Sequence, residues 1–179
     1  MRLFAALFGA ILILLPATPA DAAAAGRVFA LRATVGVDIT TPASVSLGAT
    51  FPGATLTGQL GVVAVRDTRG GGAGEQRTWV ATVSATSFVT GAGGPEQTII
   101  PAQISYWSGP AVRVTGGGAV VPGQLTSAQA VALDVTRQAF SKVSGSGNST
   151  VEWNPTIRIA VPNTATTGTY LGTITHSAA

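Results

Sequence analysis

The most informative features of this sequence are absences: among its 179 residues there is no cysteine, one histidine and one lysine, and only 9% are charged. Without cysteine the chain has no disulfide, no thiolate and no attachment point for the lipid anchor of an exported bacterial precursor. Zinc is held by clusters of cysteine and histidine, so the sequence predicts no zinc site. This scarcity of reactive side chains favours a protein that is not an enzyme and binds no cofactor.

The charged residues also form no runs. Beyond residue 24 the chain carries nine basic and six acidic residues, a formal excess of +3. The arginines are scattered rather than grouped as in a segment that follows phosphates, so we expect no nucleic-acid partner. A mild positive charge suits an anionic wall polymer or a membrane surface better.

The N-terminus has the three parts of a secretory signal peptide. One arginine precedes the apolar stretch Leu3–Leu15, and the small residues Ala20-Asp21-Ala22 follow. A helix of that length rises about 20 Å, short of the roughly 30 Å of hydrocarbon that a spanning segment must cross. We expect residues 1–24 to be a signal peptide, cleaved after Ala22 or Ala24, rather than a retained anchor. The mature protein is then secreted, extracellular or cell-wall associated, with no integral membrane segment.

Residues 25–179 have the length and composition of a single β-rich domain. Glycine (23 residues) and proline (10 residues) are frequent, and they separate short segments in which apolar and polar residues alternate. Many short alternating segments with this punctuation are typical of an antiparallel sandwich. We therefore predict an all-β fold, an antiparallel β-sandwich of about eight or nine strands. The alternating segments are residues 29–39, 79–86, 100–106, 131–135, 157–161 and 170–174.

Three segments carry finer expectations. Leu60–Val65 is nearly continuous in apolar residues, which predicts a central strand covered on both faces. Ser127–Ala132 is the best helix candidate and is expected to form at most one turn. Arg27–Ile39 is predicted to be an edge strand whose open backbone groups are able to pair with a neighbouring subunit.

Two sets of side chains are candidates for a catalytic or metal-binding site. His176 can act as a general base only if a serine hydroxyl lies beside it. No Gly-x-Ser-x-Gly motif is present, so the favoured interpretation is a histidine that is hydrogen-bonded within the fold.

Asp67 and Glu75 flank a glycine-rich loop whose oxygen atoms suggest calcium, but the spacing of a calcium loop is absent. We expect Asp67 to pair with Arg66 or Arg69 and predict no metal site.

The three tryptophans are the remaining side chains with binding potential, because aromatic rings stack on sugars and are enriched at binding surfaces. Core packing is favoured for Trp79 and Trp153, whereas Trp107 precedes a Ser-Gly-Pro turn and is expected to be the exposed ring. The candidate ligand-binding residues are Trp79, Trp107 and His176.

Three segments together resemble the WxL-domain cell-surface proteins, in particular actinobacterial members that end in Thr-His-Ser: Leu60–Gly70, Trp79–Ala85 and Ile159–Ser177. The resemblance implies a secreted β-sandwich that associates non-covalently with the Gram-positive cell wall and belongs to surface complexes. It makes Trp79 a motif residue and His176 the positional counterpart of the second motif. In this chain Ala81 stands where the family's Trp-x-Leu motif has leucine.

These observations predict a secreted, non-catalytic domain that associates non-covalently with peptidoglycan or other wall polymers. The alternative is a structural subunit or adhesin of a surface assembly, joined by edge-strand pairing to other surface proteins or to copies of itself. A hydrolase that uses His176 is the least favoured interpretation.

Overall fold

The computed structural model describes residues 22–30, 36–72 and 74–179 of the chain. Most of the predicted signal peptide, residues 1–21, lies outside the described residues, as do residues 31–35 of the first alternating segment. The described residues are all-β, with strands grouped in three sheets and helical structure confined to three short 3₁₀ turns, η1 (Pro95–Gln97), η2 (Pro101–Gln103) and η3 (Ser127–Gln129). The predicted fold class is confirmed, and no helix in these residues is long and apolar enough to cross a bilayer.

Sheet A forms one layer of the sandwich. Its strands follow the order β11 (Val120–Pro122), β13 (Arg137–Lys142), β6 (Trp79–Ala85), β16 (Thr169–Ala178), β1 (Ala22–Ala30) and β3 (Val45–Thr50), with β7 (Phe88–Val89) and β8 (Thr98–Ile99) attached beside β16. All pairings are antiparallel except β1 with β16, which is parallel. The segment predicted as one edge strand, Arg27–Ile39, is divided between two sheets: β1 pairs with β3 only as far as Gly26, so Arg27–Ala30 pair with β16 alone among the described residues, and Val37–Ile39 belong to β2, the last strand of sheet B.

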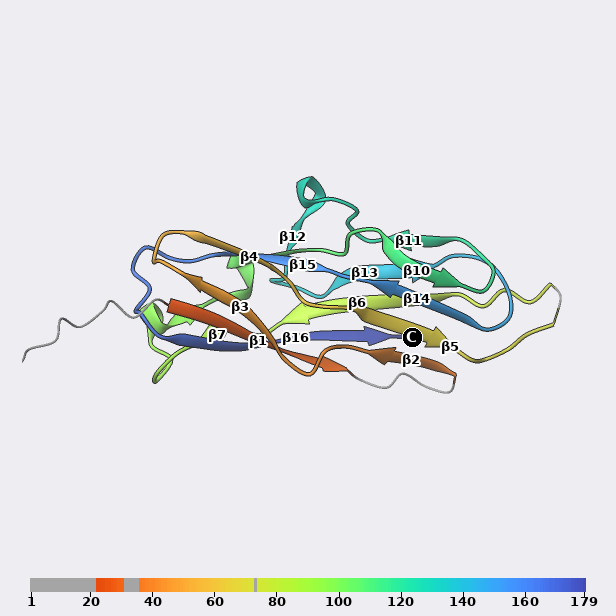
Figure 1. Cartoon of the computed structure of the whole chain (residues 1–179), viewed down its shortest axis with the longest axis horizontal. Helices are drawn as coiled ribbons and strands as arrows, with labels where there is room; N and C mark the ends of the chain where they lie inside the picture. Colours follow the sequence, from red (N-terminus) through yellow and green to blue (C-terminus); the bar gives the residue numbers. More distant parts are fainter. Residues whose placement is uncertain (1–21, 31–35, 73) are drawn as a thin grey trace, which may run out of the picture.

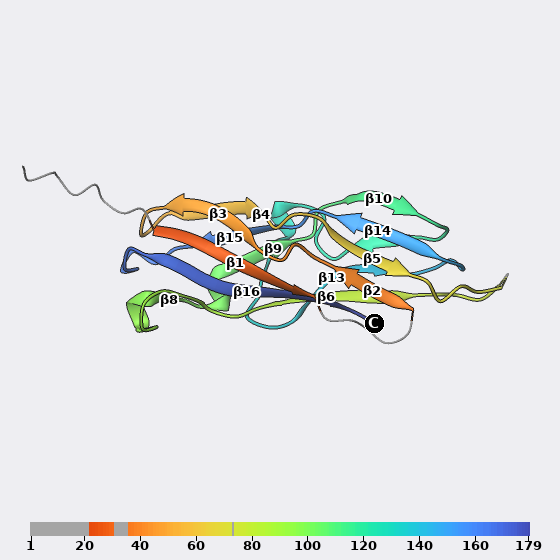
Figure 2. The same ribbon diagram turned by 60° about the horizontal axis from the view of Figure 1, so that its bottom comes forward.

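Two smaller sheets form the other layer. Sheet B has the order β10 (Ala111–Thr115), β14 (Ser149–Trp153), β5 (Val63–Asp67) and β2 (Val37–Thr40), and sheet C has the order β12 (Val131–Ala132), β9 (Ile104–Trp107), β15 (Thr156–Ala160) and β4 (Thr55–Gln59). Figures 1 and 2 show that these sheets lie end to end along the long axis of the molecule, over sheet A.

Sheets B and C are two halves of one layer, because three chain segments run through both. The pairs β4 and β5, β9 and β10, and β14 and β15 are each separated by two or three residues. Each break has a local cause: Gly61 and Gly109 adopt positive φ angles of 83° and 69°, and Pro155 has no backbone N–H to donate to a ladder. The hydrogen bond from the N–H of Leu60 to the carbonyl of Pro155, 2.8 Å, joins two of the breaks.

These breaks explain why several predictions of strand number and strand bounds were wrong. The described residues contain sixteen strand segments rather than eight or nine, since the long strands are divided. Leu60–Val65 is not one central strand: β5 begins at Val63, and Val62 is exposed at the break. Residues 101–103 form the turn η2, so the alternating segment predicted from Ile100 becomes a strand only at Ile104. The single turn expected from Ser127 is confirmed as η3, which ends at Gln129.

The core lies between the two layers and follows the alternation of the sequence. In β6 the odd-numbered residues from Trp79 to Val83 are buried, and in β15 Ile157 and Ile159 are buried. In β16 the even-numbered residues Tyr170 and Ile174 face the interior. Even-numbered residues of β5, β14 and β15 therefore face outward, which sets the chemistry of the outer surface.

Candidate functional site

His176 lies in the centre of the sandwich, with a side chain that is 0% exposed. Its Nε2 is 3.2 Å from the hydroxyl of Tyr106, and the indole N–H of Trp153 donates to the same hydroxyl at 3.3 Å. Because a phenol has one proton, we assign Tyr106 as the donor to Nε2, which completes a relay from Trp153 through Tyr106 to His176. The Nδ1 of His176 has no partner among the described residues. This arrangement resembles a core network rather than a catalytic base that a substrate reaches.

Burial sets the protonation of this relay. It lowers the pKa of His176 from 6.5 to about 4, because the surrounding interior disfavours an imidazolium. Burial also raises the pKa of Tyr106 above its ordinary value, although the hydrogen bond from Trp153 opposes part of that effect. Both groups are therefore neutral at neutral pH.

The tryptophans separate into two buried rings and one that reaches the surface. Trp79 is 2% exposed and Trp153 is 0% exposed, and Trp153 stacks on Phe140 with ring centroids 5.0 Å apart. Trp107 is half-buried at the end of β9, on the outer side of sheet C. Of the three candidate binding residues, Trp79 and His176 are thus enclosed by the fold, and only Trp107 offers part of its side chain to a ligand.

A second polar cluster is ionic and lies toward one end of the interior. Lys142, on β13 of sheet A, is buried and donates from Nζ to the hydroxyl of Ser149 at 3.1 Å. Asp67, the cross-strand neighbour of Ser149, accepts two hydrogen bonds of 2.9 Å from the guanidinium of Arg69. Burial alone raises the pKa of Asp67, but the hydrogen bonds from Arg69 outweigh it and, with the charge of Lys142, hold the pKa below its ordinary value.

The carboxylates considered for calcium are engaged elsewhere. Asp67 pairs with Arg69, as one of the two expected partners, and Glu75 pairs with Arg77 in the glycine-rich loop. In the ranges 36–72 and 74–179 no three histidine or acidic side chains gather as metal ligands would. The calcium alternative therefore gains no support from the positions of these two groups.

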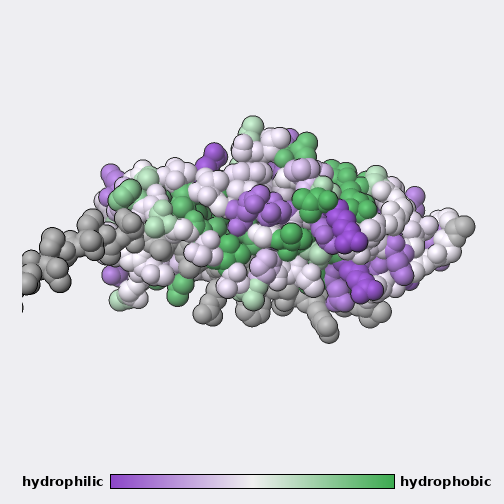
Figure 3. All heavy atoms as spheres, viewed as in Figure 1, coloured by the Kyte–Doolittle hydropathy of each residue, from purple (hydrophilic) through white to green (hydrophobic). Residues whose placement is uncertain are grey.

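The outer face of sheets B and C is the most continuous polar surface that the strands position. Two cross-strand rows on sheet B can be read from the register, Thr115, Thr150, Arg66 and Asp38 in one, and Arg113, Glu152, Ala64 and Thr40 in the other. On sheet C, Trp107 stands beside Thr156, and Arg158 stands beside Ser105 and Thr57. Figure 3 shows hydrophilic residues in purple along this face, over β15, β14 and β5.

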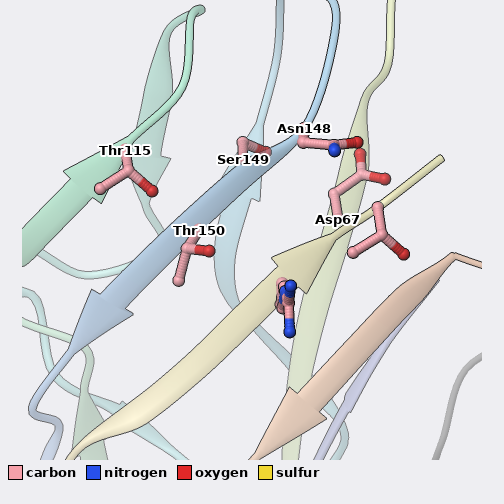
Figure 4. A pocket seen from close by; sticks show the side chains of 7 residues that line it. Asp67, Thr115, Asn148, Ser149 and Thr150 are labelled. Atoms are coloured by element: carbon pink, nitrogen blue, oxygen red, sulfur yellow. The ribbon is translucent and has the colours of Figure 1, made fainter. Parts of the chain in front are cut away.

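Two shallow hollows cut into sheet B on this side. One, of about 160 Å³, is lined by Arg66, Thr150 and their neighbours at the ends of β5, β10 and β14. The other, of about 270 Å³, lies over β2 and β5 and shares Arg66 and Thr150 with the first. Figure 4 shows Thr115, Thr150 and Asp67 contributed by three different strands. The shared residues join the two hollows into one polar groove, lined by hydroxyls, an amide, the guanidinium of Arg66 and the acidic residues Asp38 and Asp67.

The arginines of this face differ in their partners. Arg113 pairs with Glu152 at 3.5 Å, although its side chain is 65% exposed. Arg66 and Arg158 are exposed, and neither forms an ion pair within the described part of the chain. Although Asp38 stands across the strand from Arg66, no ion pair among the described residues neutralises either guanidinium, so the two arginines give this face a local positive charge.

The sequence interpretation missed Arg66 and Arg158 because it treated the arginines as scattered. A usable signal was present, since Arg158 lies between Ile157 and Ile159 and Arg66 follows the alternate apolar residues Val63 and Val65, which places both arginines on the side away from the core. The alternation cannot reveal that β5, β14 and β15 bring the two arginines to the same face.

Comparison with models of known protein families finds no match, and a search of curated proteins finds no relative. The fold and its outer face define an all-β sandwich with a polar, arginine-bearing groove.

Proposed function

We propose that the mature protein is a non-catalytic surface domain that binds an anionic, hydroxyl-rich wall polymer across the outer face of sheets B and C. The observation that carries the proposal is the groove around Arg66 and Thr150, which lies on the same outer face as the half-buried ring of Trp107 and the side chain of Arg158. The predicted signal peptide and the resemblance to WxL-domain proteins support a location at the cell surface and remain predictions.

The chemistry of the groove suits a repetitive polymer better than a small molecule. Both hollows are open and shallow, so an extended chain gains contacts by crossing several strands. Threonine, serine and asparagine exchange hydrogen bonds with sugar hydroxyls, while Arg66 and Arg158 attract phosphate or carboxylate groups. Trp107 adds an apolar surface on which a sugar ring can stack.

The test is co-sedimentation of the purified mature protein with isolated Gram-positive cell walls at low and moderate salt. We expect recovery with the walls, weakened by salt because the arginines are exposed. The double change Arg66→Gln and Arg158→Gln should lower the bound fraction several-fold, whereas Arg77→Gln, which removes one charge outside this face, should not. Recovery of the unmodified protein wholly in the supernatant at both salt concentrations would overturn the proposal.

A further inference from the structure

Exposed apolar side chains gather on one flank of the sandwich. Of the eleven large apolar side chains exposed in the described residues, six lie between the start of β10 and the residue that follows β13, namely Val112, Val114, Val121, Leu125, Val135 and Val143. Figure 3 shows part of this group in green around the edge formed by β10 and β11. Apolar side chains concentrated on one surface indicate an interaction site more often than single exposed ones do.

Both layers of the sandwich end at this flank. β10 is the last strand of sheet B and β11 is the last strand of sheet A, and a short glycine-rich turn connects them. Within the described residues β10 pairs only with β14, so its other edge presents backbone donors and acceptors that an added strand can use. The pairing of β10 with β14 is irregular between Ala111 and Arg113 and regular from Arg113 to Thr115.

We propose that this flank is a self-association surface on which β10 of a second copy adds antiparallel to β10. Opposed residues in an antiparallel pair face the same side, so a symmetric pairing must place one residue opposite itself. A pairing centred on Arg113 opposes two like charges, and one centred on Val112 falls in the irregular part of the strand. A pairing centred on Val114 opposes valine to valine and places each Arg113 beside a Thr115 hydroxyl of the other copy.

This register makes the surface self-complementary, which is the argument for a second copy as its occupant. The two B sheets become one eight-stranded sheet, and the apolar side chains of β10 are covered. A twofold axis perpendicular to the sheet keeps both outer faces on the same side, so the dimer presents two polymer grooves in one direction. The association itself rests on β10 alone and does not require the polymer.

The absence of cysteine from the chain allows a direct test of the register. Val114→Cys introduces a single thiol at the symmetry axis, and mild oxidation should give covalent dimers at least about tenfold faster than Leu171→Cys, because pairing raises the effective concentration. Leu171 is a matched control, being 50% exposed on β16. Thr115→Cys should also dimerise slowly, since the proposed register places it opposite Arg113. Equal rates for residues 114 and 171 would overturn the proposal.

Sedimentation of the protein without added thiols gives an independent measurement. We expect a concentration-dependent dimer that Val114→Arg abolishes and Val62→Arg preserves, because Val62 has a comparable exposure of 47% against 43% but lies at the break between β4 and β5. Thermal melting checks that each variant is folded. A strict monomer at the highest soluble concentration would contradict the proposal. Co-sedimentation of Val114→Arg with cell walls at low protein concentration measures polymer binding by the groove in the absence of the dimer. The two proposals can therefore fail independently.

Discussion

The interior of the sandwich holds two buried polar clusters that differ in charge. The central cluster of Trp153, Tyr106 and His176 is neutral and draws its members from both layers. The cluster of Lys142, Ser149, Asp67 and Arg69 is ionic, and the guanidinium of Arg69 reaches toward solvent. A neutral network loses only hydrogen bonds when it is broken, whereas an ionic one leaves a charge without compensation. We therefore expect the two clusters to respond differently to substitution and to pH.

The largest effect is expected from Asp67→Ala, which removes a buried carboxylate that pairs with Arg69 and whose charge also acts on the buried ammonium of Lys142. Breaking a buried pair in this way costs about 3–5 kcal/mol of unfolding free energy, measurable by urea denaturation with tryptophan fluorescence. The double change Asp67→Ala and Lys142→Met removes the uncompensated charge and should lose less than the single change. As a surface control, Asp134→Ala breaks an exposed pair with Arg137 and should cost about 0–1 kcal/mol. Equal losses for the single and double variants would show that Lys142 does not depend on Asp67.

The neutral cluster should make stability depend on pH in a defined window. The pKa of His176 is about 4 in the folded state and near 6.5 in the unfolded state, so between these values only the unfolded chain binds the proton. The unfolding free energy should then fall by about 3 kcal/mol as the pH is lowered from about 6.5 to 4, and this contribution should level off below 4. The variant His176→Gln cannot titrate there, so its stability should vary less over the same range. Identical pH profiles for the two proteins would refute this account.

The two clusters also show which structural features could be predicted from the sequence and which could not. Alternation predicted the strand at residues 79–86, one residue longer than the observed Trp79–Ala85, and the buried parity of Tyr170, Ile174 and His176. It could not predict that Tyr106 and His176 meet, because seventy residues separate them and the strand pairing decides their contact. Lys142 was also beyond prediction, since a lysine near the end of an alternating segment is ordinarily solvated and here faces the interior.

For the candidate site, too, the direction of the side chains was predictable from the sequence and their contacts across strands were not. The outward direction of Arg66 and Arg158 is implied by the alternation of apolar residues in their segments, but their common face depends on how β5, β14 and β15 are ordered. The breaks that divide the long strands were hidden for a similar reason. Gly61 lies in a run of apolar residues that reads as one strand, and its positive φ becomes necessary only because the chain passes from sheet C to sheet B at that point.

The smallest of these effects is expected from Tyr106→Phe, which removes one hydroxyl and keeps the ring. The indole N–H of Trp153 and the Nε2 of His176 each lose their partner, and leaving buried polar groups unsatisfied costs about 1–3 kcal/mol. The loss should be smaller than that of Asp67→Ala because no charge is left uncompensated. Trp153→Phe tests the relay from its other end, since it removes the indole donor together with part of the ring. If Tyr106→Phe proved as damaging as Asp67→Ala in the same urea experiment, the contrast between a neutral and an ionic cluster would be lost.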